Sequence, residues 1–273
     1  MKSSNPVLAR LTPVGHQPAP TQQPYSYGGR TYGDPGYGQQ PVGYDQMPPL
    51  TDGERMSIDD VVVKTITLVG TAVVAAAATW VVVPLTALYP TWIAAMLVGL
   101  VLGLVISFKQ VTNPVVLLSY AVVEGVFLGA VSKAFETRWS GIVLQAVIAT
   151  LSVFFIMAFL YKSRIIRATP KFMKVVIGAA TGLAVVMLLN FGISIFTGSA
   201  GPLRDGGMIA IGFSLICIVV AALMFVVSFA QIEEGIAAGL PRKYGWLGAF
   251  GILVELVWLY LEMLRLISYF QED

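Results

Sequence analysis

Three glutamates lie within apolar stretches that are long enough to cross a bilayer: Glu124, Glu255 and Glu262. A carboxylate at the centre of a membrane helix costs about 2.5–3.5 kcal/mol on insertion scales, so such groups usually face a bundle interior, a partner or a water-filled path. Carboxyl oxygens also take up protons and are the ligands that hard cations such as Ca²⁺ prefer. The three acids are therefore the first candidates for a proton- or cation-responsive site.

Glu255 and Glu262 are seven residues apart, which places them on one face of the last apolar segment. This spacing favours a path or binding groove, with Ca²⁺ as a candidate ligand at the two acids. Arg265 follows Glu262 by three residues, so an ion pair within the helix is an equally good interpretation of that acid. For Glu124 the alternatives are a protonated acid bonded to a neighbouring helix and a titrating group in a cavity.

The elements that must position these acids are apolar segments typical of membrane helices. Hydrophobic residues make up 56% of the chain and charged residues 12%, and the mean hydropathy is +0.78, which indicates an integral membrane protein. A helix needs about 20 residues to cross hydrocarbon. Seven segments of this kind are predicted, at residues 61–83, 90–108, 115–134, 142–161, 172–196, 207–229 and 244–268. We expect an all-α, multi-pass fold.

Residues 1–58 differ from the rest because Pro, Gly, Gln and Tyr dominate them. Such a composition cannot bury enough apolar surface to fold, so we expect a disordered tail, followed by a seven-helix membrane domain over residues 59–273. No apolar stretch of signal-peptide length follows Met1, and we expect the tail to be kept. It is either a passive solvated segment or a docking element for a partner.

Basic residues favour the side of the chain on which the tail lies. The turns predicted on that side carry Lys109, Arg164, Arg242 and other basic residues, whereas the opposite side carries fewer. The positive-inside rule then places the N-terminus in the cytoplasm, and an odd number of spans places the C-terminus outside. We expect a multi-pass protein of the cell membrane, with the bacterial inner membrane favoured.

Other functional classes find little support in the sequence. The net charge of +2 and the lack of a basic stripe argue against a nucleic-acid partner. No cofactor is expected, because Cys217 and His16 are the sole cysteine and histidine. Zincin, nucleophile-elbow and Walker-type motifs are absent, so we expect no enzyme. Gly125 and Gly129 form a small-xxx-small pair, for which close helix packing is sufficient explanation.

Several features in order along the chain resemble the Bax inhibitor-1 family over about residues 60–270. They are the seven segments, the stretch Glu124-Gly125-Val126-Phe127-Leu128-Gly129, the element Gln231-Ile232-Glu233-Glu234-Gly235, and Leu259-Tyr260-Leu261-Glu262-Met263-Leu264-Arg265-Leu266. The resemblance implies a Ca²⁺-permeable, pH-sensitive leak in which the other helices wrap the sixth and the seventh, and we expect the last helix to be central. It also implies a gate on the cytoplasmic side, made of two aspartates that share a proton and a basic residue of the second helix.

Carried over to this sequence, Glu262 stands at the position of the seventh-helix aspartate, and Lys109 lies near the basic residue of the second helix. The sixth-helix aspartate falls on Ser228, which is not an acid. A shifted alignment leaves other candidates for its role. These are Glu233, Glu234 and Glu255.

Three functions remain open. The first is a pH-sensitive leak for Ca²⁺ or other cations, gated by protonation of the intramembrane carboxyls. The second is a non-conducting scaffold that regulates a membrane protease or another membrane complex, with the tail as its docking element. The third is a proton-coupled transporter, which ranks last because such proteins usually show internal repeats or broken helices.

Overall fold

The computed structural model describes residues 55–198, 203–204 and 206–271, and the long elements of this part are all helices. They are α1 (Ile58–Val82), α2 (Leu88–Lys109), α3 (Pro114–Arg138), α4 (Ile142–Lys162), α5 (Pro170–Thr197), α6 (Met208–Ala237) and α7 (Gly245–Gln271), with short 3-10 turns η4 (Leu85–Ala87) and η5 (Arg242–Tyr244). Each of the seven is long and apolar enough to cross a membrane. The predicted all-α, multi-pass membrane fold is thereby confirmed.

The predicted tail lies almost entirely outside the described residues, since the description begins at Arg55 and α1 at Ile58. Helix starts follow local capping chemistry. Asn113 accepts a hydrogen bond from Val115 N at 2.9 Å before α3, and Thr169 accepts one from Phe172 N at 3.2 Å before α5. In both helices a proline follows the cap and supplies a preset φ at the first turn.

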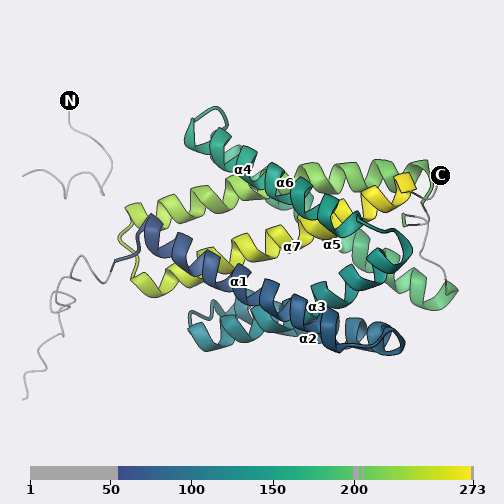
Figure 1. The fold of residues 1–273 in the computed structure, drawn as a ribbon. Coiled ribbons are helices and arrows are strands. Elements are labelled where there is room, and N and C mark those ends of the chain that lie inside the picture. The colour runs from purple at the N-terminus through teal and green to yellow at the C-terminus, as the bar shows by residue number, and fades with distance from the viewer. Residues whose placement is uncertain (1–54, 199–202, 205, 272–273) are drawn as a thin grey trace, which may run out of the picture. The chain divides into compact units, whose positions relative to one another are not determined.

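Helix α7 is the central element of the bundle. It packs against α1, α3, α4 and α6, and these neighbours surround it in Figure 1. Helix α5 lies at the periphery, with α6 as its main neighbour. The prediction of a central last helix is confirmed, so any group on α7 is placed where several helices can contact it.

The pairing of α1 with α3 depends on two glycines that the sequence singles out. A Cβ added to Gly125 would lie 2.3 Å from the carbonyl oxygen of Ala72, and one added to Gly129 would lie 2.5 Å from that of Ala76. Real side chains do not approach a backbone oxygen so closely. The small-xxx-small pair therefore does what the sequence predicts and lets the two helix backbones touch.

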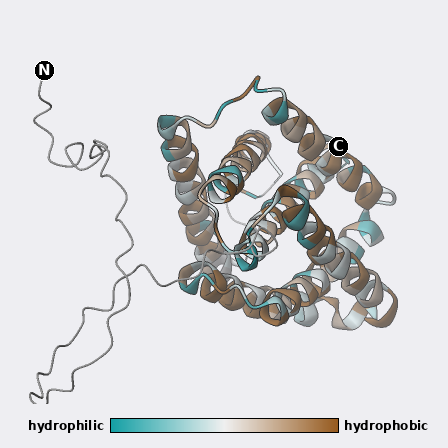
Figure 2. Cartoon of the chain, turned by 90° about the vertical axis from the view of Figure 1, so that its left-hand side faces the viewer, coloured by the Kyte–Doolittle hydropathy of each residue, from teal (hydrophilic) through white to brown (hydrophobic). Residues whose placement is uncertain are grey.

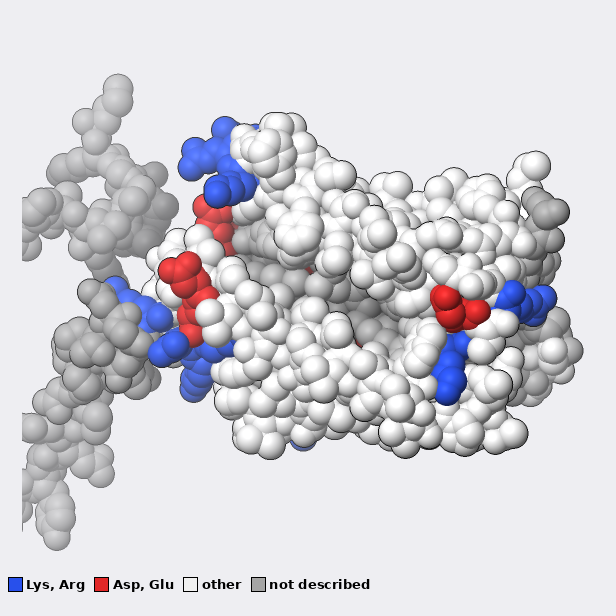
Figure 3. Space-filling model, in the orientation of Figure 1, with Lys and Arg blue, Asp and Glu red and all other residues white. Residues whose placement is uncertain are grey.

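We call the end of the bundle at which α1 begins the N-terminal end, and the end at which α7 finishes the C-terminal end (Figure 1). Apolar residues predominate along the helices, as the brown ribbons of Figure 2 show. Most of the lysines, arginines, aspartates and glutamates in the face shown in Figure 3 gather at the two ends, and the region between them is largely uncharged. This distribution is that of a bundle lying across a bilayer.

Buried charges tie helices together at the N-terminal end. The Asp60 carboxyl of α1 accepts hydrogen bonds from Lys64 and from Arg242 Nε, the latter at 2.7 Å. Lys64 also donates to the backbone oxygen of Arg242. A Cβ on Gly245, the first residue of α7, would lie 2.8 Å from Asp60 Oδ2. The start of α1 is thus locked onto the turn between α6 and α7.

At the C-terminal end, charged side chains of α3 satisfy helix termini. Lys133 donates to the backbone oxygens of Trp80 and Val83, at 2.8 and 2.6 Å, and so caps the end of α1. Glu136 accepts from the backbone nitrogens of Gly141 and Val143, at 2.6 and 3.1 Å, and caps the start of α4. These capping contacts are sufficient to explain why charged residues occupy positions 133 and 136.

Candidate functional site

Glu262 is a fully buried acid on the central helix, with 1% of its surface exposed. Arg204, in the segment between α5 and α6, donates from Nη1 to Oε2 at 3.0 Å and from Nη2 to Oε1 at 2.8 Å. Arg265 donates to Oε1 at 2.8 Å from one turn further along α7. The sequence spacing indicates the ion pair between Glu262 and Arg265. The structure shows that Arg204 also binds the Glu262 carboxylate, through two hydrogen bonds.

Arg204 is held firmly in this position. Its side chain is 13% exposed, and its guanidinium lies 5.3 Å from the centre of the Phe213 ring. Burial lowers the pKa of Arg204, but its hydrogen bonds to Glu262 and the attraction of that carboxylate outweigh burial and raise the pKa above its usual value. The result is a charged group from a connecting segment that reaches into the bundle and covers the acid of α7.

Glu255 lies two helical turns nearer the N-terminal end of α7, with 5% of its surface exposed. Ser228 of α6 donates a hydrogen bond to Oε1. The other oxygen, Oε2, has no partner among the described residues. A buried carboxyl oxygen without a hydrogen-bond donor raises the free energy of the folded protein. Glu255 is thus a polar group in the middle of the bundle with one oxygen that can still accept a hydrogen bond.

The structure does not bring Glu255 and Glu262 together. Seven residues of helix separate them by roughly 10 Å along the axis, and each has partners of its own. A single proton shared directly between these two carboxyls therefore has no geometric support. Among the described residues no cluster of three or more acidic, cysteine or histidine side chains forms that could hold a metal ion.

The remaining predicted site residues lie elsewhere. Ser228 contacts Glu255 instead of Glu262. Lys109 is exposed at the end of α2, and no hydrogen bond or ion pair joins it to an acid in the described part of the chain. Glu233 and Glu234 are exposed in the last turns of α6, where Glu233 accepts a hydrogen bond from Tyr161 of α4. These charges belong to the N-terminal end of the bundle, far from Glu262.

Glu124 belongs to a separate place, a groove of about 330 Å³ between α2, α3 and α7. Glu124 is 9% exposed and Tyr120, one turn earlier on α3, is 5% exposed. The backbone of α2 passes close to both, since a Cβ on Gly99 would lie 3.1 Å from Glu124 Oε2 and one on Gly103 would lie 3.4 Å from Tyr120 Cε2. The carboxyl thus faces a groove that two glycines leave open.

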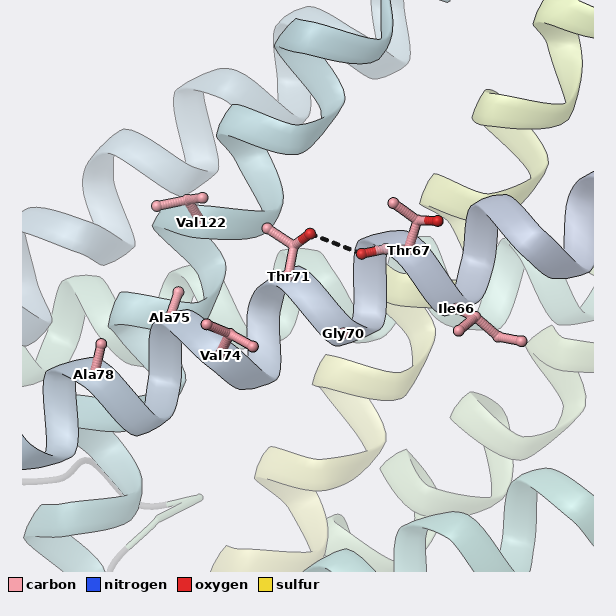
Figure 4. A pocket seen from close by; sticks show the side chains of 8 residues that line it. All are labelled: Ile66, Thr67, Gly70, Thr71, Val74, Ala75, Ala78 and Val122. Carbon is pink, nitrogen blue, oxygen red and sulfur yellow. Dashed lines mark hydrogen bonds between the residues drawn. The ribbon is translucent and has the colours of Figure 1, made fainter.

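A larger hollow of about 570 Å³ lies on the outside of α1, against Val122 of α3. Figure 4 shows small and apolar side chains along it, with a hydrogen bond from Thr71 to the backbone oxygen of Thr67, which leaves little polar capacity free. No charged side chain lines this hollow. It is a shallow surface that lipid tails can fill, and it offers no ion-binding chemistry.

Comparison with protein families agrees with this architecture. The family model of Bax inhibitor 1-like proteins matches residues 5–272. The chain belongs to the Bax inhibitor 1-like family. The match is wider than the resemblance over about residues 60–270, because it extends into the segment predicted as a tail. A search of curated proteins finds no match to this chain.

Sequence reasoning missed two parts of this member of the Bax inhibitor 1-like family. Arg204 counts in the sequence only as a basic residue on the sparsely charged side, and its isolation there is the one signal that could have drawn attention to it. Asp60 and Lys64 have the spacing of a helical ion pair. Nothing in that spacing indicates that Arg242, 182 residues away, joins them.

Proposed function

We propose that the protein is a pH-sensitive leak for Ca²⁺ and other cations, closed in this structure by the ion pairs of Glu262. The observation that supports the proposal most is the position of that acid: on the central helix, fully buried, and covered by an arginine from a connecting segment. An acid placed so deep is costly and usually marks an ion or proton path.

The gate follows from the charges. One carboxylate holds two guanidinium groups, those of Arg204 and Arg265, with hydrogen bonds of 2.8–3.0 Å. Protonation of Glu262 would remove the negative charge and leave the two cations facing each other. Without that negative charge Arg204 would lose the contact that holds it, and its withdrawal would uncover Glu262 and, further along α7, Glu255 with its unfilled oxygen. Acid should therefore open the C-terminal end.

Cation conduction then uses the acids in sequence. Carboxyl oxygens at two depths of α7 give a divalent cation successive weak contacts, and a path that binds weakly at several sites lets ions leave as well as enter. Glu255 keeps an oxygen free for this purpose. The distribution of basic residues supports a cytoplasmic N-terminal end in a cell membrane, with the bacterial inner membrane favoured. The proposed Glu262 gate then faces outward, which differs from the cytoplasmic-side gate that the resemblance implies.

The test is flux through purified protein in liposomes that contain a Ca²⁺-sensitive dye. Flux should be low at neutral pH and should rise as the medium is acidified. Glu262→Gln should leave flux high at every pH, because the neutral amide cannot hold two arginines. The matched control is Asp59→Asn, which removes an exposed charge in the first turn of α1. Vesicles that stay tight at every pH, with wild type and variant alike, would end the proposal.

The second candidate is a non-conducting scaffold for a membrane protease or another membrane complex. It is favoured by the reach of the family match to residue 5, which makes the N-terminal segment part of the family pattern. Deleting residues 1–50 separates the two functions. The deletion should spare flux if the protein is a leak, and should abolish co-purification with a partner complex if the segment is a docking element.

A further inference from the structure

We infer that the groove between α2, α3 and α7 is a binding site for a single-chain cationic amphiphile, with its ammonium group on Glu124 and its hydrocarbon chain in the bilayer. The site is independent of the Glu262 gate, because Glu124 has a different set of neighbours. Its mouth opens toward lipid, since Leu100, Leu104 and Val254 line it and are 49%, 48% and 36% exposed.

Charge selects the occupant. Glu255 has the hydroxyl of Ser228, and Glu262 has two arginines, but no ion pair involves Glu124 in the described part of the chain. Its polar companion in the groove is the Tyr120 hydroxyl. A carboxylate in an apolar, lipid-facing groove lacks a counter-charge, and a primary ammonium would supply both the charge and hydrogen-bond donors. A fatty acid would instead add a second negative charge.

Size and shape restrict the occupant further. A volume of about 330 Å³ lies at the lower end of small-molecule sites, and it suits one chain better than a two-chain phospholipid. The space exists because α2 carries glycines where it crosses the polar groups. Gly99 leaves room beside the Glu124 carboxyl, and Gly103 leaves room beside the Tyr120 ring. Phe127 and Phe250 supply apolar walls for the first methylene groups.

The experiment is photo-crosslinking of the full chain in nanodiscs with a dodecylamine analogue that carries a photoreactive group on its chain. Peptide mapping should place the crosslinks at residues 96–107 and 250–254. Unlabelled dodecylamine should compete, whereas dodecanol should compete roughly tenfold more weakly, since it lacks the charge-assisted hydrogen bond. Glu124→Gln should reduce labelling by a similar factor, and Glu234→Gln should not.

A second variant protects the test from a folding defect in Glu124→Gln. Gly103→Leu keeps the carboxyl but fills the groove, and it should abolish labelling. Its matched control is Gly178→Leu on α5, where an added Cβ meets nothing within 4 Å. Labels spread evenly over lipid-facing helices, or equal competition by alcohol and amine, would mean simple partition into the bilayer and would overturn the inference. Labelling at the groove that survives Glu124→Gln would also overturn it.

Discussion

Replacing Arg204 with glutamine should open the C-terminal end of the bundle at neutral pH. Arg204 makes two of the three hydrogen bonds that Glu262 accepts, and its side chain is 13% exposed. Removing one partner of a buried ion pair costs about 3–5 kcal/mol. Because Arg265 still holds Oε1, we take the lower value. At 1.4 kcal/mol for each factor of ten, the ratio of closed to open protein falls on the order of 100-fold.

The assay is the initial rate of Ca²⁺ entry into dye-loaded liposomes as a function of pH. The Arg204→Gln variant should leak at neutral pH as wild type does in acid, and its pH profile should be flat. Arg167→Gln, which removes an exposed charge between α4 and α5, is the matched control. The double variant with Glu262→Gln should show less than the sum of the two single effects, because the two residues interact directly.

One outcome refutes this reasoning directly. If folded Arg204→Gln protein, judged by its elution and melting temperature, keeps the flux and pH midpoint of wild type and Arg167→Gln, the ion pair is a structural brace and not a gate. A variant that loses stability without changing flux would likewise identify the ion pair as a brace. Substitution by lysine refines the test, since it keeps the charge but not the two parallel hydrogen bonds.

Three further substitutions test the packing that positions the site, each by thermal or denaturant unfolding. Gly125→Ala should destabilise by about 1–3 kcal/mol through overpacking against α1, whereas Gly178→Ala, with open space around it, should be neutral or stabilising. Asp60→Asn should cost about 1.5–3 kcal/mol, because two charge-assisted hydrogen bonds weaken; an unchanged melting temperature would contradict the lock at the N-terminal end. Glu136→Ala should cost about 0.5–2 kcal/mol by uncapping α4, and a changed pH response of flux in this variant would be unexpected.

Much of the fold could be predicted because membrane helices carry their own signal. A bilayer excludes unpaired backbone groups, so seven apolar stretches of the right length have to be helices. Close helix packing at Gly125 follows from residue size, and the sequence predicts it, but only the structure identifies α1 as the partner helix. Helix α6 is longer than predicted. Its helical hydrogen bonding continues beyond residue 229 to Ala237, through turns that are too polar to be recognised as part of an apolar segment.

The partners of the acids could not be predicted in the same way. Periodicity places Glu255 and Glu262 on one face of α7, but it does not say what lies opposite that face. Ser228 reaches Glu255 from a position 27 residues away, and Arg204 reaches Glu262 across 58 residues. Such contacts depend on how α6 packs against α7 and on where Arg204 lies beside α7. The prediction of a shared path therefore stays a proposal, while the direct sharing of one proton loses its geometric basis.

Near each end of α7, one buried carboxylate binds two basic side chains. At the N-terminal end the buried carboxylate of Asp60 holds Lys64 and Arg242, next to the first residue of α7. At the C-terminal end the carboxylate of Glu262 holds two arginines. Each lock has one acid and two bases, so loss of its single negative charge leaves two cations in repulsion. Because the two ion-pair clusters lie at opposite ends, neutralising one acid should loosen one end of the central helix and leave the contacts at the other end intact.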